Sequence, residues 1–82
     1  MKVHVFYHAF LREKLGRESE LLVIADDRWT AGTVIATFVA AHPEFERLSA
    51  ALNIAVNNEI VGRESGVNEA DRIDLLPPYG GG

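Results

Sequence analysis

The chain has 82 residues, of which 48% are hydrophobic and 24% charged, and its net charge is −4 at pH 7. A chain of this length predicts one domain, and its scattered Lys and Arg residues indicate neither a nucleic-acid partner nor a membrane partner. The sequence contains no cysteine, so disulfides and thiolate chemistry are excluded and a cytoplasmic location is expected. The first ten residues lack the features of a signal peptide, and no run is long enough to predict a membrane span.

The first half of the chain alternates between strand and helix patterns. Residues 2–10 divide into two alternating faces that are rich in β-branched and aromatic side chains, which predicts a strand. Residues 11–16 predict one or two helical turns ending at a glycine, and residues 20–24 predict a second strand, antiparallel to the first. Residues 30–42 predict the main helix, because Thr30 is a good N-cap, apolar side chains recur at helical spacing and a proline follows.

The second half predicts shorter elements. Residues 44–52 indicate a short second helix, residues 54–56 and 60–61 two short strands joined by an Asn-Asn turn, and residues 72–76 the last strand. This order predicts an α+β fold in which one main helix packs across one face of a mixed sheet and the last strand lies beside the first. The expected architecture is the β-grasp, or ubiquitin-like, fold.

The residues that build common active sites do not occur in a recognisable arrangement. The sequence contains neither a phosphate-binding loop nor a Gly-x-Ser-x-Gly nucleophile elbow. His4 and His8 would lie about 13 Å apart on a strand, which is too far for two ligands of one metal ion. We therefore expect half-exposed strand histidines, no metal site and no active site within the chain.

The last six residues form a distinct segment, a tail over 77–82 that follows a domain over 1–76. Its paired prolines fix φ and hold the chain extended, whereas its terminal glycines present bare backbone. A terminal carboxylate is an anion at neutral pH and an oxygen nucleophile. The pattern predicts that Gly82 is the reacting residue and enters the active site of another enzyme; a frayed, glycine-rich end is the alternative. The residues expected to thread into that site are Pro77, Pro78, Tyr79, Gly80 and Gly81.

Four segments in order resemble the MoaD/ThiS family of ubiquitin-like sulfur carrier proteins. They are FLREKLG at 10–16, AVNNEIV at 55–61, VNEADRIDLLPP at 67–78 and the terminal PPYGGG. The resemblance covers essentially the whole chain. Ala70 stands where the family usually has glycine, which predicts strain if φ is positive there. Tyr79 and Gly80 replace the common valine and small residue, and the aromatic ring could alter which partner channel accepts the tail.

The resemblance implies a carrier that binds no cofactor itself. A ubiquitin-activating-type adenylating enzyme, similar to MoeB or ThiF, would supply ATP, adenylate the Gly82 carboxylate and, with a persulfide sulfur donor, convert it to a thiocarboxylate. The length and the paired prolines most resemble the small subunit of molybdopterin synthase, which gives its sulfur to a MoaE-like large subunit in molybdenum cofactor biosynthesis. Carriers for thiamine, cysteine or tRNA thiolation are alternatives, as is a ubiquitin-like conjugation or binding module.

Partners are expected to bind the sheet face that points away from the main helix, because a six-residue tail is too small to provide specificity. The candidate docking residues are Phe6, His8, Arg12, Ile60 and Leu76. The resemblance implies that Ile60 and Leu76 occupy apolar, partner-facing positions. The alternative interpretation places Phe6 and Ile60 in the core.

Overall fold

The computed structural model describes residues 1–78, and five strands form one mixed sheet in the order β2-β1-β5-β3-β4. The strands are β1 (Lys2–Tyr7), β2 (Ser19–Val23), β3 (Asn53–Val56), β4 (Glu59–Val61) and β5 (Ile73–Leu76). The helices are α1 (Ala9–Leu15), α2 (Ala31–Ala41) and the 3-10 helix η1 (Pro43–Ala51). Within residues 1–78 no helix is both long and apolar enough to cross a bilayer.

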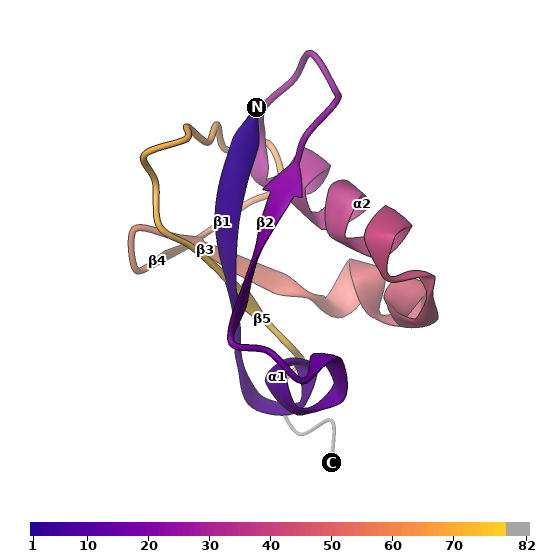
Figure 1. Cartoon of the computed structure of the whole chain (residues 1–82). Helices are drawn as coiled ribbons and strands as arrows, with labels where there is room; N and C mark the ends of the chain where they lie inside the picture. The colour runs from indigo at the N-terminus through magenta and orange to yellow at the C-terminus, as the bar shows by residue number, and fades with distance from the viewer. Residues whose placement is uncertain (79–82) are drawn as a thin grey trace.

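The sheet is mixed because its two central strands run parallel. β1 pairs antiparallel with β2 and parallel with β5, and β3 pairs antiparallel with both β4 and β5. Figure 1 shows α2 and η1 on the same side of the sheet, which we call the inner face, while α1 lies at one end. We call the opposite side the outer face. The predicted β-grasp architecture, with the last strand beside the first, is confirmed.

The core fills the space between the inner face and α2. Alternation along β1 sends Val3, Val5 and Tyr7 inward, and each is at most 1% exposed. The ring of Phe38 packs from α2 at 5.5 Å from the ring of Tyr7 and at 5.6 Å from that of Phe45 in η1. The buried side chains of α2 are Ala31, Val34, Ile35 and Phe38. Burial of each larger side chain stabilises the fold by about 1.5–3 kcal/mol.

The backbone N–H groups at the start of α2 find hydrogen-bond acceptors within the chain, as expected for Thr30 at the N-cap. The Thr30 and Thr33 side chains form a capping box, with bonds of 2.9 and 3.2 Å to each other's backbone N–H. Carbonyls of the 63–65 loop accept from the N–H groups of Ala31 and Gly32 at 2.8 Å. These bonds satisfy amides that a helix normally leaves unpaired, so the loop occupies the place where an anion could otherwise bind.

Three sequence expectations are corrected. The first strand ends at Tyr7 rather than at residue 10, and α1 begins at Ala9 rather than at residue 11, because the chain turns at Ala9, whose φ is 51°. The 44–52 segment is the 3-10 helix η1 rather than an ordinary helix, and it begins one residue earlier, at Pro43. A proline suits a first helical position, and a short connector squeezed between α2 and β3 adopts the tighter winding easily. Ala70 is not strained, because the non-glycine residues with positive φ in the described part of the chain are Ala9, Asn57 and Asn58.

Asn57, in the turn between β3 and β4, ties that hairpin to the start of β5. Its φ is 53°, in the left-handed region that asparagine tolerates. Its side-chain amide donates to Asp71 at 3.0 Å, its side-chain oxygen accepts from the Arg72 N–H at 2.9 Å, and its own N–H donates to the Arg72 carbonyl at 2.8 Å. The asparagine therefore fixes where β5 begins.

Substitutions of Asn57 should separate its two roles, which are to adopt a left-handed backbone conformation and to form side-chain hydrogen bonds to residues 71 and 72. Asn57→Gly keeps the left-handed conformation but loses both side-chain bonds, so we expect a loss of about 1–3 kcal/mol in the free energy of unfolding. Asn57→Ala should lose about 1 kcal/mol more, because alanine disfavours positive φ. Chemical denaturation measures both, with Asn58→Gly as the matched control. Equal stability of the Asn57→Gly and Asn58→Gly variants would show that the side-chain bonds contribute nothing.

Candidate functional site

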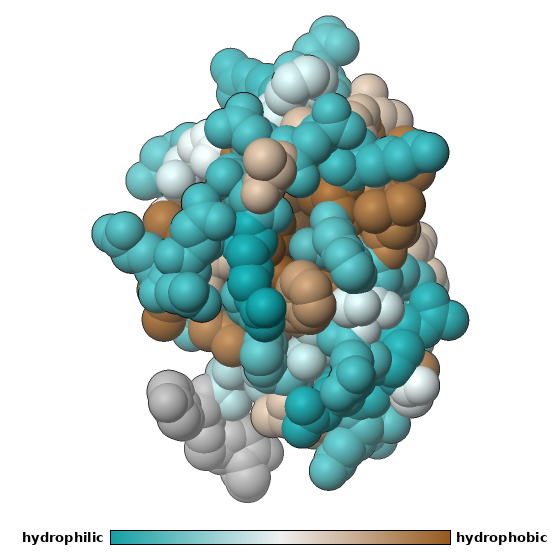
Figure 2. Space-filling model, turned by 60° about the vertical axis from the view of Figure 1, so that its left-hand side comes forward, coloured by the Kyte–Doolittle hydropathy of each residue, from teal (hydrophilic) through white to brown (hydrophobic). Residues whose placement is uncertain are grey.

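The outer face is defined by the strand residues that alternate with the core residues. In the sheet register Phe6 lies opposite Asp74, and Asp74 in turn lies opposite Ala55. The strand residues that point outward are Lys2, His4, Phe6, Ser19, Leu21, Val23, Asn53, Ala55, Ile60, Asp74 and Leu76. Figure 2 turns this side forward and shows hydrophilic side chains running between hydrophobic patches. The face therefore combines apolar area with charge.

Most of the sequence-predicted docking residues lie on this face. Phe6 and Leu76 are half-buried and Ile60 is 62% exposed, so none of the three belongs to the core. His8 follows the end of β1, and its side chain lies at the same face because it bonds Asp74 of β5. Arg12 is exposed on α1, at the end of the sheet. The structure thus brings Phe6, His8 and Leu76 together; the docking role of all five residues stays a prediction.

Several residues of this face were not singled out from the sequence as docking residues. Leu21 and Val23, on the edge strand β2, are 58% and 59% exposed and extend the apolar area beyond Phe6. Their alternation with the inward-facing Leu22 could have identified them. Arg72 and Asp74 alternate with inward-facing residues in the same way, but alternation does not show that they pair with each other and with His8.

Asp74 sits at the centre of a polar cluster in the middle of the outer face. It is only 6% exposed, and it accepts a 2.7 Å hydrogen bond from His8 Nε2. Arg72 donates to both carboxylate oxygens, through Nε and Nη2, at 3.1 Å each. The Arg72 guanidinium also lies 4.1 Å above the centre of the Phe6 ring, a cation–π geometry. We call Phe6, His8, Arg72 and Asp74 the Asp74 cluster.

The cluster stabilises the charged form of its carboxylate. Burial alone would raise the pKa of Asp74, but the hydrogen bonds and positive charge that Arg72 and His8 provide outweigh burial. The pKa of Asp74 is therefore lowered, and the side chain is an anion under neutral conditions. An ionised carboxylate in the centre of a sheet face is unusual, because such positions generally favour β-branched or aromatic residues.

A second polar cluster lies at the edge of the inner face and has a structural explanation. Glu20 of β2 accepts from Tyr7 Oη at 2.5 Å, from His42 Nε2 at 2.8 Å and from Arg17 at 2.9 Å. Burial would raise the pKa of Glu20, but these donors outweigh it and lower the pKa. Since His42 ends α2, the carboxylate fastens the C-terminal end of the helix to β1 and β2.

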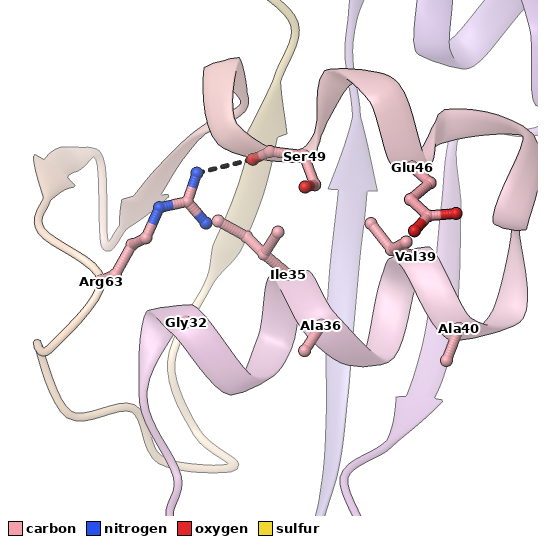
Figure 3. A pocket seen from close by; sticks show the side chains of 8 residues that line it. All are labelled: Gly32, Ile35, Ala36, Val39, Ala40, Glu46, Ser49 and Arg63. Atoms are coloured by element: carbon pink, nitrogen blue, oxygen red, sulfur yellow. Dashed lines mark hydrogen bonds between the residues drawn. The ribbon is translucent and has the colours of Figure 1, made fainter.

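A shallow groove of about 410 Å³ lies between α2 and η1 (Figure 3). Its lining residues are Gly32, Ile35, Ala36, Val39, Ala40, Glu46, Ser49 and Arg63. The Arg63 guanidinium donates to the backbone carbonyls of Ser49, at 2.6 Å, and Leu52, at 3.4 Å. Arg63 therefore closes the end of η1. Within residues 1–78 no group of three or more acidic or histidine side chains could hold a metal ion.

The expected tail begins where the outer face meets one end of the sheet. Leu75 of β5 lies opposite Tyr7 of β1, so β5 finishes beside the end of β1, near α1 (Figure 1). Pro77 and Pro78 follow directly and are half-buried. The other predicted tail residues, Tyr79 to Gly82, lie outside the described residues. Leu76, the last outward-facing residue, therefore connects the outer face to the tail.

A five-stranded mixed sheet crossed by one helix, with its first and last strands paired, places the chain in the ubiquitin-like β-grasp class. The profile of the ThiS family matches residues 5–82, and the chain belongs to this family. The molybdopterin synthase sulfur carrier subunit of Chlamydomonas reinhardtii is 27% identical over the whole of both chains. The resemblance found in the sequence is thereby confirmed.

Solved structures share the fold over nearly the full length. SAMP1 from Haloferax volcanii is 26% identical, with a TM-score of 0.78 over 100% of both chains. The BexX/CysO complex of Amycolatopsis orientalis contains a chain that is 26% identical, with a TM-score of 0.71 over 98% of this chain and 99% of that one. In that structure the related protein is part of a complex with another protein.

The Asp74 cluster predicts a specific pH dependence of stability. Because the pKa of Asp74 is lower in the folded state than in the unfolded state, its contribution is present above the unfolded value, near 4, and is lost as pH falls through the folded value. Asp74→Asn should therefore be less stable than the wild type by about 1.5–3 kcal/mol at neutral pH. Below about pH 4 the difference between the two proteins should shrink.

Denaturant melts of the wild type and Asp74→Asn across this pH range measure the effect. Glu20→Gln is the matched comparison, because the pKa of Glu20 is also lowered but its carboxylate lies at the edge of the inner face. A stability difference for Asp74→Asn that stays constant from neutral to acidic pH would show that the charge of Asp74 does not contribute.

Proposed function

We propose that this chain is a sulfur carrier whose Gly82 carboxylate is adenylated, converted to a thiocarboxylate and used in molybdopterin biosynthesis. The observation that carries the proposal is the family match, which extends through residue 82 and so includes the paired prolines and terminal glycines. The full-length similarity to the Chlamydomonas molybdopterin synthase sulfur carrier subunit supports this pathway. In this role the chain is a subunit that acts within a complex and needs no active site of its own.

The chemistry proceeds by ordinary acyl transfer. A carboxylate oxygen of Gly82 attacks the α-phosphorus of ATP, and pyrophosphate leaves, giving an acyl-adenylate. A persulfide sulfur then attacks the acyl carbon, and AMP leaves. A thiol cleaves the resulting acyl disulfide, forming a new disulfide and releasing the thiocarboxylate. Because the chain has no cysteine, the persulfide and the thiol both come from partner proteins.

The partners in this proposal are a ubiquitin-activating-type adenylating enzyme, similar to MoeB or ThiF, and a MoaE-like large subunit. The adenylating enzyme binds ATP and the sulfur donor, and the large subunit accepts the sulfur. The carrier contributes the outer face for docking and the tail for reaction. The solved complex that contains CysO supports the idea that another protein binds a chain with this fold.

Conjugation to lysine is the second candidate function. The similarity to SAMP1, a small archaeal modifier protein, favours it. In this case the activated Gly82 carbonyl would be attacked by a lysine amine, and an amide would form in place of a thiocarboxylate. The two functions share the adenylation step and differ in the nucleophile that follows.

Removing Gly82 should abolish activation without affecting the fold. Within residues 1–78 the buried core side chains lie between Val3 and Leu75, so we expect deletion of Gly82 to leave the melting temperature unchanged. Misplacing the carboxylate by one residue, or adding a side chain through Gly82→Ala, should reduce ATP–pyrophosphate exchange by about 100-fold or more. Glu44→Gln, on the exposed side of η1, is the control and should exchange normally. Full exchange by the deletion variant would contradict adenylation at Gly82.

Mass spectrometry of the C-terminal peptide separates the two functions. After incubation with the adenylating enzyme, ATP and a persulfide donor, we expect the peptide containing Ile73 to Gly82 to gain the mass difference between sulfur and oxygen. A thiocarboxylate hydrolyses more slowly than an acyl-adenylate, so it should accumulate. Lysine-linked adducts without the sulfur form would support conjugation instead. An unmodified peptide would contradict both functions.

A further inference from the structure

We infer that the Asp74 cluster recognises a carboxylate on the partner surface that covers the outer face. Arg72 is the group that contacts this carboxylate. The inference rests on the proposed function only for the choice of partner, an adenylating enzyme. Its basis is the charge, the unused hydrogen-bonding capacity and the geometry of the cluster.

The strands of the outer face carry few carboxylates for a chain with a net charge of −4. Asp74 is the only carboxylate among the outward-pointing strand residues of the described part. Lys2 also points outward, and Arg72 lies over the centre of the face. Because Asp74 is buried and paired with Arg72, an approaching protein meets the guanidinium before the carboxylate. This surface fits a partner with an acidic group.

Arg72 has hydrogen-bonding capacity to spare. Its guanidinium carries five N–H donors, of which Nε and one on Nη2 bind Asp74, and Nη1 makes no hydrogen bond within residues 1–78. The side chain is 51% exposed and its guanidinium carbon lies over the Phe6 ring. A partner that covered it without an acceptor would bury charged donors unpaired, which is costly. A carboxylate matches the remaining edge of the guanidinium and removes this cost.

The backbone holds His8 in place at a cost. The next residue, Ala9, has φ of 51°, a left-handed conformation that is unfavourable for alanine. His8 itself is extended and precedes α1. The strained turn therefore reverses the chain directly after the imidazole that bonds Asp74. Strained residues of this kind concentrate where a side chain must be positioned.

Calorimetry of the full chain with the adenylating enzyme tests the inference. Titrations at constant pH measure the dissociation constants of the wild type and of the Arg72 variants.

Arg72→Gln should weaken binding by about 10- to 100-fold at constant pH, because the partner carboxylate loses its guanidinium. Arg72→Lys keeps the charge without the planar fork and should bind between the two. Arg47→Gln is the matched control: Arg47 lies on η1, which packs on the other side of the sheet, and its affinity should equal that of the wild type. Thermal melts of each variant exclude misfolding.

An unchanged affinity of Arg72→Gln would overturn the inference. ATP–pyrophosphate exchange with the wild type distinguishes this failure from failure of the proposed function. Normal exchange with docking that does not depend on Arg72 contradicts the recognition role alone, whereas absence of both binding and exchange contradicts the carrier function as well.

Discussion

The parallel pairing of β1 with β5 is the constraint on which the rest of the structure depends. It joins segments almost the full chain length apart and sets Val5 beside Ile73 and Tyr7 beside Leu75, all four beneath α2. The same register sets Phe6 beside Asp74 on the outer face, so one set of backbone bonds builds both the centre of the core and the centre of the docking surface. Since β5 ends beside the end of β1, it also decides where the tail leaves the domain.

The two faces of the sheet follow different physical rules. The inner face is mainly apolar. The polar cluster around Glu20 lies at its edge, where hydrogen bonds from Tyr7 and His42 connect the C-terminal end of α2 to the sheet. The outer face has its most buried charge at the centre, where a hydrophobic side chain of similar size would serve stability about as well. The hydrogen bonds from His8 and Arg72 offset the burial of Asp74 and leave a net excess of donors. Under our inference, that excess is available to a partner that covers the outer face.

Local signals in the sequence were sufficient for most of the fold. Thr30 and the proline after His42 bracket α2 to within a residue, and the alternation of Val3, Val5 and Tyr7 correctly identified the buried side of β1. The β-grasp order followed from the sequence of elements. The 3-10 winding of η1 was missed because its apolar spacing is compatible with both helix types, and the winding is decided by the short connection to β3.

The site was predictable only in part, for a physical reason. Alternation is a local property, so it correctly placed Phe6 and Leu76 on the outer face and could also have placed Leu21 there. The contact between His8 and Asp74 spans 66 positions in the chain and depends on the register of a parallel pair, which no local pattern encodes. The left-handed φ of Ala9 likewise has no signal, since alanine is an unfavourable residue for that conformation.

Docking and reaction are separated in space, and the length of the tail links them. Leu76 is the last residue of the outer face, and the six residues that follow it extend at most about 20 Å. Any enzyme that acts on Gly82 must therefore hold its catalytic centre within that distance of its contact with the end of β5. The paired prolines restrict the backbone conformations available at the base of the tail, because they fix φ at both positions and disfavour helical conformation at the residue before them. Under the proposed function, the outer face sets the choice of partner, and the short tail with its two prolines places the reacting carboxylate once docking is correct.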